Sequence, residues 1–224
     1  MAAKHSDKIY AELRRRIMSG RYEAGAHLRE EHIAQEFGVS RTPVRAAMQR
    51  LEADQLVTIE SRGAIVARWT DWDVAEIFEL RMLLEPFAAS MAARRASDAD
   101  IARMDALNTE MLGLVRAKGE PQLQRIEAIN NAFHHLVLEA AGSGRLKGLA
   151  SSFVDTPVMI GSFYFYSSAE LAESAQHHVV ITDAIRRRDA DFAARAMEYH
   201  LKVSAARFEK QRVTRKTDDP PTQD

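Results

Sequence analysis

The stretch Gly38-Val39-Ser40-Arg41-Thr42-Pro43-Val44-Arg45 decides how the first third of this chain folds. Ser40 is a favoured N-cap residue, because its hydroxyl can accept a backbone N–H that the start of a helix leaves without a partner. Pro43 falls in the first helical turn, where its missing N–H costs nothing. The apolar residues that follow repeat at helical spacing: Val44, Ala47, Met48 and Leu51. These signals predict a helix that begins directly after Ser40.

A second helix is expected just before this one, over residues 30–37, with Ile33 and Phe37 on one face and Gly38 at its end. Two helices joined by a short turn that contains glycine are typical of a helix-turn-helix. In that motif the second helix enters the major groove, and its first residues contact the edges of the bases. The sequence therefore predicts DNA contacts from Arg41, Thr42 and Arg45. Arginine can bind guanine through two hydrogen bonds, and threonine can bind a phosphate or touch a thymine methyl group.

A short hairpin is expected after the second helix. Residues 56–60 and 64–67 have the pattern of two short strands, and Ser61-Arg62-Gly63 forms the turn between them. A basic hairpin beside a recognition helix is the wing of a winged helix-turn-helix domain, which we expect over residues 1–69. The alternative is a surface helix whose arginines are only solvated. It is disfavoured because the turn, N-cap, helix and hairpin follow one another in the expected order.

These motifs resemble the GntR family of bacterial regulators over residues 6–68. Four segments carry the resemblance: residues 28–34, residues 38–45, Leu51-Glu52 and Leu56-Val57. The resemblance implies a transcription regulator rather than an enzyme. It also implies that double-stranded DNA is contacted by Arg41, Thr42, Arg45 and the wing residues Arg62 and Gly63.

The bulk properties agree with this prediction and add little to it. Residues 1–70 hold 12 Lys and Arg against 9 Asp and Glu, whereas the rest of the chain holds 19 against 23. This asymmetry has the sign expected of a DNA-binding N-terminal half, but it is modest. The chain has no cysteine, and no stretch approaches the roughly 20 apolar residues of a membrane span. We therefore expect a cytoplasmic protein with no membrane partner.

The remaining sequence predicts an all-helical domain over residues 70–211, so the whole chain is mostly α. The apolar spacing predicts a bundle of six helices, or seven if Pro86 interrupts the first. Ser97 and Asp100 are typical of a helix start. We expect residues 212–224 to form a disordered tail, because they are polar and include Pro220-Pro221.

Five of the eight histidines lie beyond residue 130, within this helical domain. Asn130 and His134 are one turn apart on the same helix, whereas His178 and His200 belong to two later helices. Three imidazoles and an amide oxygen facing one cavity would suit a borderline divalent ion. The alternative is that these histidines are separate core or surface residues, because periodicity cannot show that three helices converge.

The helical half resembles the FCD effector domain of FadR-type GntR proteins over residues 73–208. The segments that carry this resemblance are Phe133-His134, His178 with Asp183-Ala184-Ile185, residues 197–201, Arg81 with Glu85, and residues 139–142. It implies a metal held by Asn130, His134, His178 and His200, with zinc as the first choice and nickel or manganese as alternatives. Asn130 stands where aspartate is more usual, so the lower negative charge predicts weaker metal affinity.

The same resemblance implies that a small organic acid binds beside the metal. Arg81 is the candidate for the acid's carboxylate, and the alternative for Arg81 is a salt bridge to Glu85 one turn away. We therefore expect a regulator, a repressor in our interpretation, that binds two half-sites as a homodimer. Two further hypotheses are a regulator whose histidines bind the acid without a metal, and a metal-dependent hydrolase. The sequence has no His-Glu-x-x-His motif to favour the hydrolase.

Overall fold

The computed structural model describes residues 2–117, 122–156 and 166–218. The chain divides into two compact units, the first consisting mainly of residues 1–74 and the second mainly of residues 75–155 and 165–224. The predicted domain boundary after residue 69 lies in the short segment between strand β3 and helix α4. Among the described residues, no helix combines the length and the apolar character that a bilayer crossing needs.

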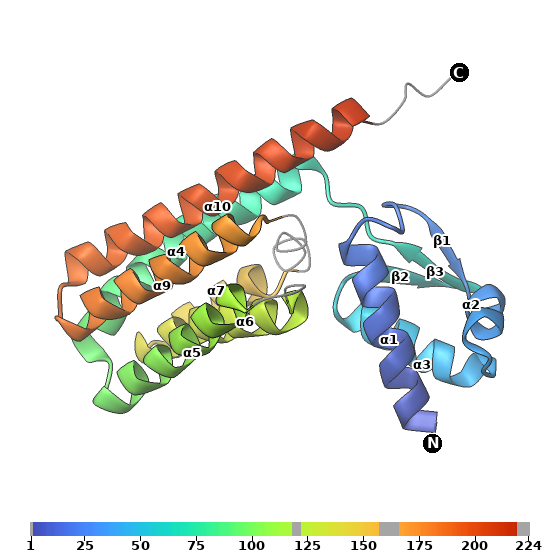
Figure 1. Ribbon diagram of the computed structural model, residues 1–224, viewed down its shortest axis with the longest axis horizontal. Coiled ribbons are helices and arrows are strands. Elements are labelled where there is room, and N and C mark those ends of the chain that lie inside the picture. Colours follow the sequence, from blue (N-terminus) through green and yellow to red (C-terminus); the bar gives the residue numbers. More distant parts are fainter. Residues whose placement is uncertain (1, 118–121, 157–165, 219–224) are drawn as a thin grey trace. The chain divides into compact units, whose positions relative to one another are not determined.

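The first unit contains the predicted helix-turn-helix (Figure 1). Helix α1 spans Ala2–Met18, α2 spans Glu30–Phe37 and α3 spans Arg41–Ala53. Gly38 ends α2 in the left-handed conformation at φ 62°, which glycine adopts without strain. Ser40 occupies the N-cap position of α3 with an extended backbone, but its side chain makes no capping hydrogen bond. The expected hydroxyl cap is therefore wrong, although the helix begins where it was predicted.

The wing belongs to a three-stranded antiparallel sheet, so the predicted two-stranded wing needs correction. Strand β2 (Val57–Glu60) pairs with β3 (Gly63–Val66), and Ser61-Arg62 forms the tip between them. The additional strand β1 (His27–Arg29) pairs with the other edge of β3, which gives the order β1-β3-β2. The sequence did not predict β1, because Leu28 is its only apolar residue and three residues are too few to establish an alternation.

A single hydrophobic core holds the helices and the sheet of this unit together. The apolar faces of α1 and α3 meet in this core, and residues of the three strands close it from the other side. Its fully buried members include Ile9, Leu13, Val44, Ala47, Met48 and Leu51. The buried face of α3 leaves Arg41, Thr42 and Arg45 exposed at its start. The packing of α3 therefore presents the predicted DNA-contacting residues to solvent.

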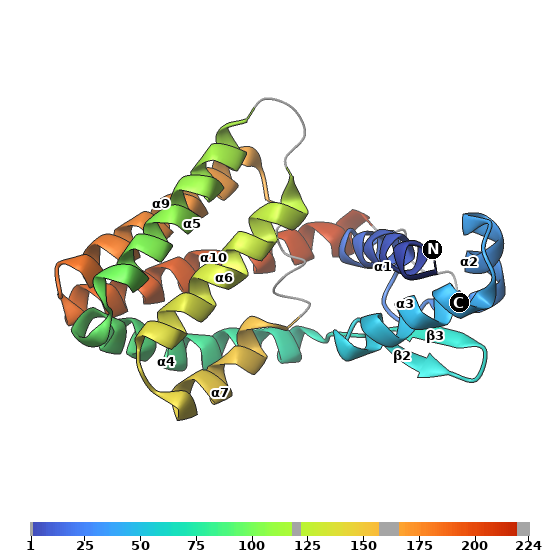
Figure 2. The ribbon, with the colours of Figure 1, turned by 90° about the horizontal axis from the view of Figure 1, so that it is seen from below.

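The second unit consists of helices in its described part (Figure 2). They are α4 (Asp71–Arg95), α5 (Asp98–Arg116), α6 (Leu123–Ala140), α7 (Gly144–Val154), α9 (Ser168–Arg186) and α10 (Ala190–Asp218). Helix α4 continues through Pro86, so the described part of the second unit has the six helices expected if this proline did not interrupt the first one. Helix α10 extends past Gln211 to Asp218, so the disordered tail predicted from residue 212 is wrong as far as Asp218. Residues 219–224 lie outside the described part of the chain.

Helix α9 packs against both α5 and α10, and α6 packs against both α5 and α7. Helix α5 begins where Ser97 and Asp100 predicted a helix start, and the two residues form a capping box in which each side chain binds the other's backbone N–H. Ala89, Ala92 and Ala93 line the inner face of α4, where their small side chains let neighbouring helices approach closely, and Ala96 just after the helix joins the same core. They share one core with Phe133 of α6, Ile181 of α9 and Leu201 of α10. This core brings together the three helices that carry the predicted metal ligands.

Gly63 provides a stability test of the three-stranded sheet. Its φ is +155°, and a Cβ atom at this position would lie 2.1 Å from the carbonyl oxygen of Leu28 in β1. We expect Gly63→Ala to destabilise the first unit by about 1–3 kcal/mol, because the added methyl group forces the backbone of β1 to shift. Hydrogen exchange of the β1 and β3 amides and thermal unfolding would measure the loss. Gly38→Ala is the control, because φ is also positive there but nothing lies within 4 Å of the added Cβ. Equal losses in the two variants would contradict the steric argument.

Candidate functional site

The first candidate surface lies at the start of α3, beside the wing. Arg41 and Arg45 are one helical turn apart, with side chains 45% and 60% exposed. Thr42 is exposed between them, whereas Pro43 and Val44 point into the core. Two guanidinium groups and a hydroxyl on one end of an exposed helix can donate hydrogen bonds to base edges or phosphates.

A cleft of about 670 Å³ lies between the start of α3, the wing and β1. Arg41, Arg62 and Gly63 line it, as do two residues that the sequence analysis did not single out, His27 and Arg29 of β1. These two were missed because β1 itself was not predicted. The same cleft has acidic residues, Glu31 and Glu60. Gly63 differs from the others in this lining, because the structure gives it a steric role in strand pairing.

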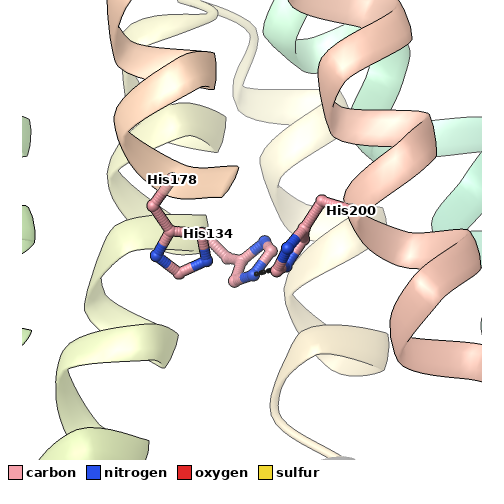
Figure 3. Close-up of side chains that lie close together, drawn as sticks. All are labelled: His134, His178 and His200. Carbon is pink, nitrogen blue, oxygen red and sulfur yellow. Dashed lines mark hydrogen bonds between the residues drawn. The ribbon is translucent and has the colours of Figure 1, made fainter. Parts of the chain in front are cut away.

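The second candidate site lies inside the helical unit. His134 of α6, His178 of α9 and His200 of α10 are all buried, and a ring nitrogen of each lies within 4.8 Å of the others. Figure 3 shows that the three side chains point toward one another from their separate helices. The Nε2 atoms of His134 and His200 are 3.3 Å apart. The structure thus brings together three histidines whose convergence the spacing alone could not establish.

Burial controls the charge of this histidine cluster. It lowers the pKa of His178 and of His200 well below the ordinary value, and the neighbouring histidines and Arg81 act in the same direction. Both rings are therefore neutral near pH 7. A neutral imidazole keeps a lone pair on one nitrogen, which is the form that binds metal ions.

Several buried polar atoms at this site have no hydrogen-bond partner among the described residues. They are both ring nitrogens of His178 and Nδ1 of His200, and Oδ1 of Asn130 on α6 likewise has none. Asn130 lies one turn before His134 on α6, and it is buried as well. A buried polar atom that lacks a partner costs about 1–3 kcal/mol. Such atoms call for a partner, and a bound ion or water is one way to supply it.

His134 is held by a buried carboxylate. Its Nδ1 lies 2.5 Å from Oε2 of Glu85, and Oε1 of Glu85 accepts a hydrogen bond from Nε of Arg81 at 2.6 Å. Burial opposes ionisation of Glu85, but the charges of Arg81 and His134 outweigh it and lower the pKa of this carboxyl. The ionised carboxylate can only accept, so Nδ1 of His134 donates to it, and Nε2 on the other side of the ring faces His200.

The structure places Arg81 in the alternative arrangement that the sequence analysis left open. Its side chain is buried, and it pairs with Glu85 one turn away on α4. The sequence identified this pair but assigned no role to Glu85, because nothing in the spacing showed that Glu85 would reach His134 on another helix. A carboxylate behind a histidine fixes both the orientation and the tautomer of the ring.

The ring of His178 is also fixed, in this case by an aromatic neighbour. Phe133 of α6 stacks on it with ring centroids 4.0 Å apart and planes within 8°. The two histidines next to the cluster behave differently from each other. His135 is partly exposed and lies 2.7 Å from Asp155 through its Nε2. His177 packs against Tyr199, and its ring centroid is 5.8 Å from that of His200.

The three histidine nitrogens lie within 4.8 Å of one another, so they could hold a divalent metal ion. Two nitrogens bound about 2.1 Å from a tetrahedral zinc ion lie about 3.4 Å apart, which is close to the 3.3 Å between Nε2 of His134 and Nε2 of His200. Imidazole nitrogens are common ligands of borderline divalent ions. The second-sphere contact from Glu85 is of the kind that accompanies histidine ligands.

Comparison with known proteins agrees with both halves of the chain. Residues 5–66 match the model of the bacterial regulatory proteins of the gntR family, and residues 76–203 match the FCD domain. The galactonate operon transcriptional repressor of Escherichia coli K12 is 27% identical, with 88% of this chain and 93% of the relative covered. The gluconate operon transcriptional repressor of Bacillus licheniformis is 24% identical, with 87% of this chain and 81% of the relative covered.

Among solved structures, E. coli McbR/YncC has the same fold, with a TM-score of 0.69 at 20% identity. The match covers 93% of this chain and 98% of that one. These matches confirm the predicted fold class, a winged helix-turn-helix followed by a helical bundle. The gntR family model describes regulatory proteins, and the two relatives are transcriptional repressors rather than enzymes. The chain belongs to the GntR family of DNA-binding transcription regulators and carries an FCD domain in its C-terminal half.

Proposed function

We propose that this regulator is a cytoplasmic, homodimeric repressor whose operator binding is controlled by a small organic acid bound beside a divalent metal ion. The observation that carries the proposal is the buried cluster of His134, His178 and His200. Both relatives described above are repressors of operons for sugar-acid use. A hydroxylated carboxylate of that class is therefore the effector we propose. Arg41, Thr42, Arg45, Arg62 and Gly63 are the proposed contacts to the operator.

The metal would be held by the three histidines and by Oδ1 of Asn130. When bound, the ion supplies a Lewis-acid centre to which a carboxylate oxygen can bind. Asn130 contributes no negative charge, so this site is expected to bind the ion less tightly than one with aspartate. Zinc remains the first choice, and nickel and manganese use the same ligand types.

Arg81 is the proposed partner for the carboxylate of the acid. Its Nε donates to Glu85, so its terminal Nη groups are the donors that an incoming carboxylate would use. Guanidinium binds carboxylates through paired hydrogen bonds. The acid can change operator affinity only as far as it binds the DNA-free and DNA-bound states differently.

A regulator without a metal remains the second candidate. In this alternative the histidine nitrogens and Asn130 bind the acid directly by hydrogen bonds, and the unpartnered buried atoms favour it as much as they favour a metal. The two candidates differ in whether a chelator abolishes the response to the acid.

The metal site has a matched pair of test substitutions. Purified protein is stripped with a chelator, reloaded with zinc and analysed for metal content. We expect about one ion per chain in the unsubstituted protein and a loss of at least tenfold in affinity for His178→Ala, because a direct ligand is lost. His177→Ala is the control, since its ring adjoins the cluster but is not part of it. Full occupancy in the His178 variant would contradict the ligand assignment.

The response to acid is tested with a DNA duplex selected by this protein from a random-sequence pool. We expect gluconate or galactonate to weaken operator binding by zinc-loaded protein about tenfold, which lies within the usual 1–3 kcal/mol of coupling between sites. Chelated protein is expected to bind the duplex and to ignore the acid. An equal response after chelation would support the alternative without a metal. If neither acid changed binding by either form, the proposed effector class would be wrong.

The homodimer has a candidate surface on α4. Leu83 and Phe87 lie one turn apart there, with 71% and 58% of their surface exposed. Large apolar residues so exposed on one helix face favour association, and a helix-turn-helix protein that binds two half-sites requires a second copy. We expect Leu83→Glu to convert the dimer to a monomer in sedimentation velocity, because it places a charge in the interface. Phe192→Glu on α10 is the control for adding a charge at an exposed apolar residue. A stable dimer in the Leu83 variant would place the interface elsewhere.

A further inference from the structure

The two exposed arginines at the start of α3 share one buried carboxylate. Glu30 is the first residue of α2, and its side chain is only 9% exposed. Its Oε2 accepts a hydrogen bond from Nε of Arg41 at 3.0 Å, and its Oε1 accepts one from Nε of Arg45 at 2.7 Å. One side chain thus bridges the first helix of the motif to both arginines of the second.

The backbone of Glu30 is held from both sides. The residue before it, Arg29, is the last residue of β1 and pairs with Gly63 of β3. The residues after it belong to α2, which packs against α3. The carboxylate therefore projects from a fixed point where the sheet and the helix-turn-helix meet.

Glu30 is ionised at neutral pH. The hydrogen bond from Arg45 lowers the pKa of this carboxyl, burial opposes the shift, and the hydrogen bond from Arg41 adds to the lowering. The carboxylate also separates two positive groups that would otherwise repel each other one turn apart. The pairs contribute little to stability, because the arginines themselves are largely exposed to solvent.

The contact uses Nε of each arginine, and this choice of atom has a consequence for binding. With Nε held, the torsions of each long side chain are restricted and the plane of each guanidinium is oriented. The terminal Nη groups remain as donors for a guanine edge or a phosphate. Arginine side chains lose conformational freedom when they bind, so side chains that are already oriented bind with less loss.

We infer that Glu30 is a positioning residue for operator recognition, which holds Arg41 and Arg45 in the orientation that discriminates one DNA sequence from another. This inference rests on the proposed DNA contacts of the two arginines. It predicts an effect on sequence discrimination rather than on general affinity for DNA. General affinity depends on net charge and phosphate contacts, whereas discrimination depends on where the guanidinium groups point.

The neighbouring residue Glu31 offers a matched control. It lies in the same turn of α2, but its side chain is 78% exposed. It contacts Nη1 of Arg41 at 3.5 Å, a distance at which an exposed pair is weak. Glu30→Gln and Glu31→Gln each remove one negative charge from the first turn of α2, but only Glu30 contacts both arginines through Nε. Any difference between them therefore reports orientation rather than charge.

The experiment measures the affinity of full-length protein for a selected duplex and for a scrambled duplex of equal length at one salt concentration. Both substitutions are expected to strengthen binding to the scrambled duplex by a similar small factor, because each removes a negative charge. We expect Glu30→Gln to lower the ratio of specific to nonspecific affinity about tenfold and Glu31→Gln to leave it within twofold. An unchanged ratio in the Glu30 variant, or equal losses in both variants, would overturn the inference.

A second arm separates positioning from folding. In an Arg41→Ala/Arg45→Ala background, Glu30→Gln is expected to have no further effect on the ratio, because the groups that it positions are gone. A further loss there would show that Glu30 acts through the fold instead. Circular dichroism checks that each variant is folded. If Glu30→Gln does not fold, Glu30→Asp replaces it, because aspartate keeps the charge but is too short to reach both arginines. We expect Glu30→Asp to lower the ratio of specific to nonspecific affinity as Glu30→Gln does.

The outcomes also separate this inference from the proposed DNA contacts. If Arg45→Ala alone kept full discrimination, the proposed contact of Arg45 itself would be wrong. If Arg45→Ala lost discrimination and Glu30→Gln kept it, only the positioning role would be rejected.

Discussion

Three imidazole rings buried at one point constrain how α6, α9 and α10 pack. An apolar residue tolerates a small rotation of its helix, but a buried ring nitrogen must meet a partner or incur the cost of losing its hydration. Glu85 supplies that partner for Nδ1 of His134, and Phe133 fixes the ring of His178 by stacking. Both ring nitrogens of His178 and Nδ1 of His200 remain without a partner among the described residues. The three histidines are therefore part of the core packing, so a shift of α6, α9 or α10 would also move the rings of the candidate site.

Both units use a buried glutamate to hold the groups that face a partner. Glu85 fixes His134 from behind and is itself neutralised by Arg81. Glu30 fixes Arg41 and Arg45 from behind and is neutralised by them. In each case a carboxylate is buried at a cost that its cationic neighbours offset. The common physical result is that long or rotatable side chains are oriented before any ligand arrives.

The sequence predicted features whose signals are local and missed those that depend on tertiary packing. The turn at Gly38, the start of α3 and the capping box at Ser97 each follow from a few adjacent residues, and the structure has all three. Strand β1 was missed because three residues carry no period, and the continuity of α4 through Pro86 was left open because surrounding helices can hold a helix together across a proline. The histidines were identifiable by type and spacing, but their convergence, and the part of Glu85 in it, depend on how separate helices pack.

Helix α4 is the element through which the two candidate sites can influence each other. It begins at Asp71, only a short segment after the wing strand β3 ends at Val66, and it carries both Arg81 and Glu85. An acid that competes for Arg81 would weaken the neutralisation of Glu85, and Glu85 in turn orients His134. The charge balance of the histidine site is thus tied to the same helix that leaves the DNA-binding unit. Coupling of this kind requires that the protein has two conformations and that the acid binds one of them more tightly. The effect of the acid on DNA binding cannot exceed this difference in acid affinity.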